Sequence, residues 1–225
     1  IERQCGVEVI EHIIVKPVAE KKTVSFTQLW SGAFARRTLM LWLIWFGIVY
    51  SYYGIFTWLH SLLVKQGYSI VQSFEYVLVM ILAQLPGYVA AAWLVEKLGR
   101  KATLAGFIGM CAVSAYFFGQ ADTVSMIMFW GCLMSFFNLG AWGVLYTYTP
   151  EQYPTNIRAF GSGWASAIGR MGGIVAPMVV THMMVQSNGF SAIFMMFTAV
   201  LLAVAAVILI LGEETKGKTL EEIGL

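Results

Sequence analysis

Long runs of apolar residues constrain this chain more than any other feature of its sequence. A bilayer core takes about 20 residues of helix, so each run is long enough to cross a membrane, the third only just. Charged residues make up 12% of the chain, about half of what a soluble domain carries, and the mean hydropathy is +0.73. The sequence therefore predicts an all-α membrane protein with six transmembrane helices. The runs lie at 38–64, 73–95, 102–119, 123–149, 160–185 and 189–211.

The segment before the first run is polar and then amphipathic. Residues 1–22 carry mixed charges and are expected to form a solvated loop. Within 23–37, Ser25 can cap a helix, and apolar residues then recur at helical spacing. This pattern predicts a short helix in the membrane interface, which Arg36 and Arg37 would end. The apolar residues are Phe26, Leu29, Trp30 and Phe34.

The first residue and the cysteines add two expectations. The chain begins with Ile1 rather than Met, so we expect a fragment. Cys5, Cys111 and Cys132 lack the spacing of metal ligands, and two of them fall in apolar runs. They are expected to be small core residues, with neither a metal site nor a disulfide framework.

Positive residues are distributed unequally on the two sides of these runs. Cytoplasmic segments of membrane proteins carry an excess of Lys and Arg. Lys65 is alone on one side, whereas the other side holds Arg36, Arg37, Lys97, Arg100, Lys101, Arg158, Lys216 and Lys218. The asymmetry predicts a multi-pass protein of the cell membrane with both ends of this segment cytoplasmic, including a tail at 213–225.

The runs at 38–64 and 123–149 carry polar and aromatic residues at steps of three or four. They begin two helix triplets of opposite orientation, the building unit of many secondary transporters. Facing lipid, such hydroxyl, amide and indole groups would find no partners, so we expect them to point inward. Aromatic belts and hydrogen bonds between helices are the alternative. The residues are Trp42, Phe46, Tyr50, Tyr53, Thr57 and His60, then Ser135, Asn138, Trp142, Tyr146 and Thr149.

Arg170 lies near the middle of the fifth run. An ionised side chain at bilayer depth is costly and needs a partner, a water-filled cavity or a charged solute. No carboxylate lies at similar depth in this sequence. A cavity role and a buried structural pair both remain open. The same run is rich in small residues that allow a second backbone to approach closely, among them Gly161, Gly163, Gly169, Gly172 and Gly173.

Acidic and basic residues gather in the turns at 96–101 and 150–159 and in the tail. Isolated surface ion pairs contribute about 0–1 kcal/mol each. A network that exists in only one conformation could nevertheless bias a two-state equilibrium. We therefore expect a cytoplasmic gate formed by Glu96, Arg100, Lys101, Glu151, Arg158 and Glu213.

These charged segments resemble motifs of the major facilitator superfamily. E-K-L-G-R-K at 96–101 looks like the D-R-x-G-R-R/K signature between helices eight and nine, with Glu96 in place of Asp. P-E-x-x-P-T-x-x-R-A at 150–159 resembles the turn between helices ten and eleven, and E-T-K-G-K-T-L-E-E-I at 214–223 the tail after helix twelve. The resemblance covers 23–225. It implies the C-terminal half of a twelve-helix transporter, with a missing N-terminal six-helix half and 1–22 ending the central loop.

Two further stretches resemble bacterial permeases for niacin and related metabolites, in the synaptic-vesicle and organic-ion branch. They are YYGIFTWLHSLLVKQGYS at 52–69 and GSGWASAIGRMGGIVAP at 161–177. This resemblance implies uptake of a small aromatic or organic anion by alternating access, as in a symporter. In the superfamily, helices seven and ten line the central cavity and helix eleven flanks it, which agrees with the polar faces described above. We therefore expect the solute to be bound by Tyr50, Tyr53, Asn138, Trp142, Tyr146 and Arg170.

The sequence leaves two other functions open and argues against an enzyme. A sugar or polyol porter shares the turn and tail motifs, although its Gln-Gln pair on helix seven is missing here. A non-transporting membrane receptor or scaffold could have the same fold. An enzyme is not expected, because His12, His60 and His182 are scattered and no phosphate loop is present. The expected partners are a small solute and the lipid bilayer, with no cofactor, metal or nucleic acid.

Overall fold

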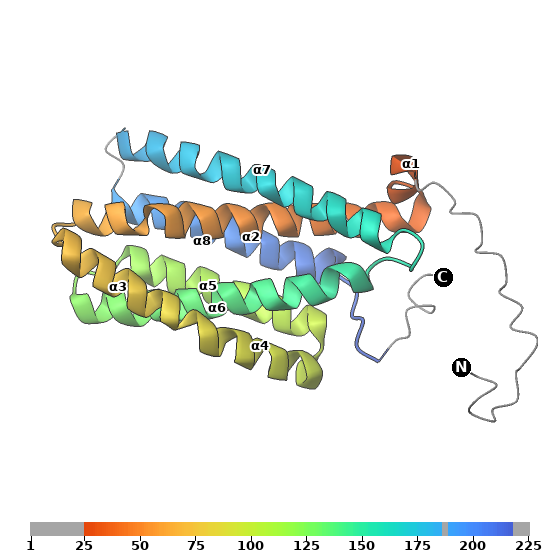
Figure 1. Ribbon diagram of the computed structural model, residues 1–225, viewed down its shortest axis with the longest axis horizontal. Helices are drawn as coiled ribbons and strands as arrows, with labels where there is room; N and C mark the ends of the chain where they lie inside the picture. The colour runs from red at the N-terminus through yellow and green to blue at the C-terminus, as the bar shows by residue number, and fades with distance from the viewer. Residues whose placement is uncertain (1–24, 186–188, 218–225) are drawn as a thin grey trace, which may run out of the picture.

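The computed structural model describes residues 25–185 and 189–217, which form one bundle of helices (Figure 1). Six spans are long and apolar enough to cross a membrane, which confirms the predicted all-α, six-span fold. The expected loop at 1–22 and the tail from 218 onward lie outside the described residues. The helices are α1 (Phe26–Leu29), α2 (Gly32–Lys65), α3 (Ile70–Leu82), α4 (Gln84–Leu98), α5 (Arg100–Gly119), α6 (Val124–Glu151), α7 (Arg158–Val185) and α8 (Phe190–Leu211).

The predicted interfacial helix at 23–37 differs from the structure. α1 ends at Leu29, and α2 begins at Gly32, whose φ of +38° permits the sharp turn between them. The Thr38 hydroxyl donates to the Leu29 carbonyl oxygen at 2.9 Å and so holds α1 against α2. Arg36 and Arg37 therefore belong to the first span instead of ending a separate helix.

The second span is divided, which its apolar pattern did not predict. α3 ends at Leu82, and α4 begins at Gln84. Pro86 has no backbone N–H, and its ring would clash with the carbonyl group four residues earlier, that of Leu82. Regular helix bonding is interrupted there, although both pieces still form one span, Ile70–Leu98.

The two helix triplets occupy equivalent places in the bundle. The lead helices α2 and α6 touch each other; α7 packs along α2, and α4 packs along α6. The third helices, α5 and α8, pack together on the remaining side. In Figure 1, α7 and the pair α3–α4 form opposite borders of the bundle. The helices α4, α6, α2 and α7 thus follow one another as a wall, supported from behind by α5 and α8.

Glycines allow the closest helix contacts in this wall. A Cβ atom at Gly172 of α7 would lie 2.5 Å from the Phe46 carbonyl oxygen of α2. Likewise, Gly87 of α4 lies against the Phe136 carbonyl oxygen of α6. The predicted small-residue surface of α7 is therefore a packing surface, with one exception. Gly163 faces open space.

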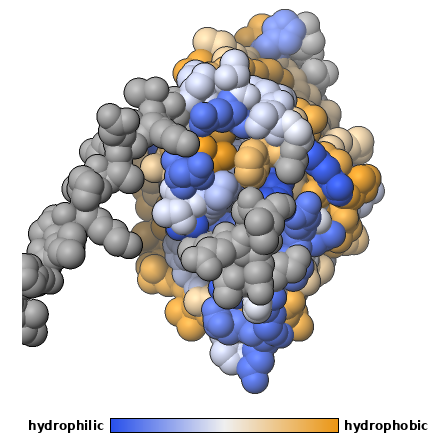
Figure 2. Space-filling model, turned by 90° about the vertical axis from the view of Figure 1, so that its right-hand side faces the viewer, coloured by the Kyte–Doolittle hydropathy of each residue, from blue (hydrophilic) through white to orange (hydrophobic). Residues whose placement is uncertain are grey.

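Hydrophilic side chains collect at the end of the bundle that carries α1, the α4–α5 turn and the α6–α7 turn. We call it the polar end. Figure 2 shows this end, with blue hydrophilic residues at its centre and orange apolar residues around the flanks.

The glycine contact makes a testable prediction. Gly172→Ala should destabilise the protein by about 1–3 kcal/mol, because the added methyl group meets a carbonyl oxygen that cannot rotate away. Thermal melting of the purified protein measures the change. Gly163→Ala on the same helix is the matched control and should not lower the melting temperature, since nothing lies within 4 Å of its Cβ position. Equal melting temperatures for Gly172→Ala and the wild type would contradict the packing argument.

Candidate substrate site and gate

A run of aromatic rings crosses the wall from α7 to α6 and begins at Arg170. The Arg170 Nη1 atom lies 3.4 Å from the Tyr53 hydroxyl oxygen, to which it donates. Tyr53 meets Tyr52 edge to face, with ring centroids 5.7 Å apart, and Tyr52 meets Trp142 in the same way at 5.6 Å. Trp142 then contacts Tyr146 at 5.8 Å. One continuous aromatic surface therefore links α7, α2 and α6.

The α6 end of this surface is fixed from behind. Trp45 of α2 packs edge to face on Tyr146 with centroids 5.2 Å apart, and its indole N–H donates to the Thr149 hydroxyl at 2.9 Å. Tyr146 is 52% exposed and Tyr53 is 37% exposed. The supporting ring of Trp45 is thus buried, while the outer rings are exposed.

Arg170 has no ionic partner among residues 25–185 and 189–217. It is exposed near the middle of α7, and its Nη1 atom donates a hydrogen bond to a neutral phenol, that of Tyr53. A guanidinium at that depth in an apolar span needs either water or an anion. Of the two explanations left open by the sequence, the described part of the chain contains no buried pair for it.

The structure places two of the predicted substrate residues away from this surface. Tyr50 is buried, and its hydroxyl donates to the Met196 sulfur of α8 at 3.3 Å. Asn138 is also buried, and its amide donates to the Cys111 sulfur of α5 at 3.6 Å. Each four-residue step turns a helix by about 40°, so a series of such steps does not stay on one side. Tyr53, Trp142, Tyr146 and Arg170 are the predicted residues brought together.

Two tyrosines of the aromatic surface were missed from the sequence. Tyr52 meets Tyr53 and Trp142 edge to face, and the Tyr88 ring lies against Gly143, the residue after Trp142 in α6. Tyr88 comes from α4, the second helix of its triplet, whereas the polar faces that the sequence indicates belong to the two lead helices. Its position directly after a close-packing glycine, Gly87, was the available signal.

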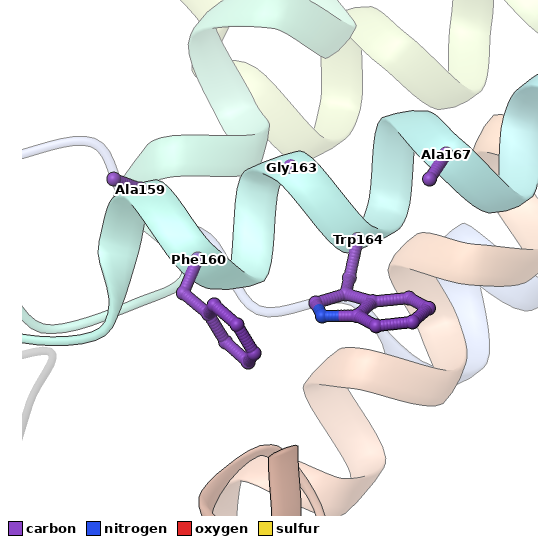
Figure 3. A pocket seen from close by; sticks show the side chains of 5 residues that line it. All are labelled: Ala159, Phe160, Gly163, Trp164 and Ala167. Carbon is purple, nitrogen blue, oxygen red and sulfur yellow. The ribbon is translucent and has the colours of Figure 1, made fainter. Parts of the chain in front are cut away.

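A hollow of about 300 Å³ lies on α7 between Arg170 and the polar end. Figure 3 shows Phe160 and Trp164 projecting from the same side of the helix. Gly163, Ala167 and Arg170 follow at steps of four and three, so the hollow and the guanidinium share one side of α7. The lining residues are Ala159, Phe160, Gly163, Trp164 and Ala167.

At the polar end, Glu151 joins α6 to α5 and to the tail. The Arg100 Nε atom lies 3.2 and 3.1 Å from its two carboxylate oxygens, and the Thr215 hydroxyl donates to it at 2.5 Å. Glu96 completes this group with an ion pair to Arg100 at 3.8 Å. The predicted association of Glu96, Arg100 and Glu151 is present in the structure.

Glu213 forms a second group with a partner that was not predicted. Its carboxylate pairs with Arg37 of α2 at 2.7 Å, and Arg37 also donates to the Gln152 carbonyl oxygen at 3.4 Å. The Tyr148 hydroxyl bridges the same turn, donating to the Glu213 carbonyl oxygen at 2.8 Å. The polar ends of α2 and α6 are thereby tied to the tail.

Glu214 caps the start of α5, a role also missed from the sequence. Its carboxylate accepts the backbone N–H groups of Arg100 at 2.8 Å and Lys101 at 3.0 Å. Gly99, with φ of +94°, leaves room for it, since a Cβ there would lie 2.6 Å from a Glu214 oxygen. Burial opposes ionisation, but the four N–H donors, including those of Thr215 and Lys216, outweigh it and lower the pKa of Glu214.

Two predicted gate residues form no side-chain ion pair within the described ranges. Arg158 donates to the Tyr153 carbonyl oxygen and to the Thr155 hydroxyl, both at 3.3 Å, and so stabilises its own turn. Lys101 takes part through its backbone N–H.

Comparison with known proteins adds independent findings. Residues 8–225 match the family model described as sugar (and other) transporter. The chain is 82% identical over 225 residues to the niacin transporter NiaP of Acinetobacter baylyi, covering all of this chain and 51% of that protein. It is 54% identical over 193 residues to the putative niacin/nicotinamide transporter NiaP of Bacillus subtilis, covering 86% and 48%. It is 29% identical over 215 residues to the synaptic vesicle 2-related protein of Xenopus laevis, covering 86% and 39%. The chain thus spans about half the length, or less, of these relatives.

The Glu214 cap gives a pH-dependent prediction. A carboxylate whose pKa is lowered by folding stabilises fully above its ordinary value, about 4.3, and loses that contribution as the pH falls through the lowered pKa. Wild type should therefore melt at a higher temperature than Glu214→Gln near neutral pH, and the two melting curves should converge in acid. Glu75→Gln, at an exposed position of α3, is the control and should leave the curve unchanged. A difference that persists at low pH would contradict the assignment.

Proposed function

This chain belongs to the sugar (and other) transporter family of the major facilitator superfamily, and we propose that it forms half of a niacin transporter that works by alternating access. The observation that carries the proposal is the exposed aromatic surface that begins at Arg170, a guanidinium with no ionic partner in the part of the chain that the structure describes. Relatives named as niacin transporters support the choice of solute. A sugar or polyol porter is the second candidate, supported by the family description.

Niacin is a pyridine ring with one carboxylate, and both parts fit this surface. Arg170 offers a planar, permanently charged fork that can bind a carboxylate through two parallel hydrogen bonds. Tyr53 and Tyr146 offer exposed rings on which a small heteroaromatic ring packs favourably, and the buried Trp142 supports Tyr146. A sugar could contact the rings and hydroxyls, but it is neutral and could not form an ion pair with Arg170.

The remaining walls of the chamber come from the other half of the transporter. We assign the polar end to the cytoplasm because it holds the basic residues, in agreement with the positive-inside rule. The hollow beside Phe160 and Trp164 lies between Arg170 and that end, so it lines the route by which niacin leaves toward the cytoplasm. A proton-carrying acid, if the protein is a symporter, also comes from the other half.

The ionic groups of the polar end act as the cytoplasmic gate. Glu151 with Arg100, and Glu213 with Arg37, join helices that are distant in sequence. Singly each pair contributes little, but together they hold the ends of α2, α5 and α6 with the tail as one unit. We propose that this unit is fully formed in the outward-open state and biases the protein toward it.

Replacement of Arg170 tests the solute assignment. Arg170→Gln should raise the nicotinate concentration needed for half-maximal uptake about 10- to 100-fold, because a charge-assisted hydrogen-bonded pair is lost. Arg170→Lys should retain part of the affinity, and neutral nicotinamide should be affected less than nicotinate. Uptake of labelled solute into proteoliposomes that hold the complete transporter measures each value, with sugars as competitors. Arg36→Gln is the control for loss of a positive charge. Unchanged nicotinate uptake by Arg170→Gln would refute the role of Arg170, and competition by sugars alone would favour the second candidate.

Replacement of Glu151 tests the gate. Glu151→Gln removes the charge that holds Arg100, so the inward-open state should become more populated. A cysteine introduced by Gly163→Cys, in a background without other cysteines, should then react faster with a thiol reagent added from the cytoplasmic side. Glu75→Gln should leave the labelling rate unchanged. Equal rates in Glu151→Gln and the parent would show that the pair does not bias the equilibrium.

A further inference from the structure

We infer that Tyr88 of α4 recognises the ring nitrogen of the solute and so separates nicotinate from aromatic acids that lack it. The inference rests on the proposed function and adds a residue from a fourth helix to the site. It also gives the site a polar contact at the end opposite Arg170.

The position of Tyr88 is set by two glycines. Gly87 brings the α4 backbone against the Phe136 carbonyl oxygen of α6. Seven residues further along α6, a Cβ atom at Gly143 would lie 2.9 and 3.0 Å from two carbons of the Tyr88 ring. The ring therefore lies directly on the α6 backbone at a place where any larger residue would displace it.

From this position Tyr88 extends the aromatic surface. Its ring lies against Gly143, which directly follows Trp142 in α6 and comes three residues before Tyr146, and Tyr88 is 40% exposed. Because α4 and α7 flank the lead helices on opposite sides, Tyr88 and Arg170 stand at the two ends of the surface. A solute between them meets a cation at one end and a phenol at the other.

The Tyr88 hydroxyl is available for such a contact. In residues 25–185 and 189–217 it makes no hydrogen bond to the protein, whereas the hydroxyls of Tyr50, Tyr148 and Tyr153 all donate to protein atoms. A phenol O–H can donate to the lone pair of a pyridine nitrogen. A site built to form such a bond rejects analogues that cannot, because its polar group is then left without a partner.

Niacin and benzoate provide the matched pair of solutes. Both are planar six-membered rings with one carboxylate, and only niacin has a ring nitrogen. Arg170 acts on both acids alike, so their difference in affinity reports the contact at the far end. The substitution Tyr88→Phe removes the hydroxyl and keeps the ring against Gly143.

Inhibition of labelled nicotinate uptake into proteoliposomes tests the inference. In the wild type, unlabelled nicotinate should inhibit more strongly than benzoate. In Tyr88→Phe the nicotinate inhibition constant should rise about three- to tenfold with little change for benzoate. Tyr116 is an exposed tyrosine on α5 outside the aromatic surface, so Tyr116→Phe is the matched control. It should retain the wild-type ratio of the benzoate inhibition constant to the nicotinate inhibition constant. Gly143→Ala, which displaces the Tyr88 ring without removing its hydroxyl, should lower the ratio as well.

The outcomes separate the two proposals. An unchanged ratio in Tyr88→Phe, or a loss of preference in Tyr146→Phe instead, would overturn the role of Tyr88 while nicotinate transport stands. A complete wild-type transporter that neither binds nor transports nicotinate would overturn the proposed function and this inference with it.

Discussion

The close approach of α7 to α2 sets the geometry on which the candidate site depends. Gly172 lies directly beside the Phe46 carbonyl oxygen of α2, and Gly169 lies against the Trp45 and Val49 side chains. Since Arg170 lies between these glycines, the contact that fixes the helix also fixes the guanidinium beside Tyr53. A residue with a larger side chain at either glycine would shift the charge away from the aromatic surface. Packing and charge placement are therefore one property of this helix.

The opposite flank of the wall has the same design. Gly87 holds α4 against α6, and the next residue, Tyr88, is the one that reaches the aromatic surface. Both flanking helices thus place a functional side chain next to a glycine that touches a lead helix. This similarity follows from the two triplets, whose second helices occupy equivalent positions. The wall has a cation on one flank and a phenol on the other, with ring faces from the lead helices between them.

Sequence patterns predicted the spans and the local contacts far better than the partners of each side chain. Apolar length alone predicted six spans, and the short turn at 96–101 predicted the Glu96–Arg100 pair. The division at Ala83 was missed because an apolar run gives no sign of it except Pro86. Tyr50 and Asn138 were assigned to the cavity because helical spacing shows which residues share a broad face, but not where the neighbouring helices divide it. Arg37 and Glu214 find partners more than 100 positions away, and local pattern carries no information on such contacts.

The cap that Glu214 provides has a consequence for how the chain is made. The amides at the start of α5 belong to the third span, whereas their carboxylate partner follows the sixth. During translation, three further spans must enter the bilayer before that partner leaves the ribosome. The turn after Gly99 therefore remains without this partner through most of membrane insertion, and it gains its final hydrogen bonds only as the last residues of the bundle emerge.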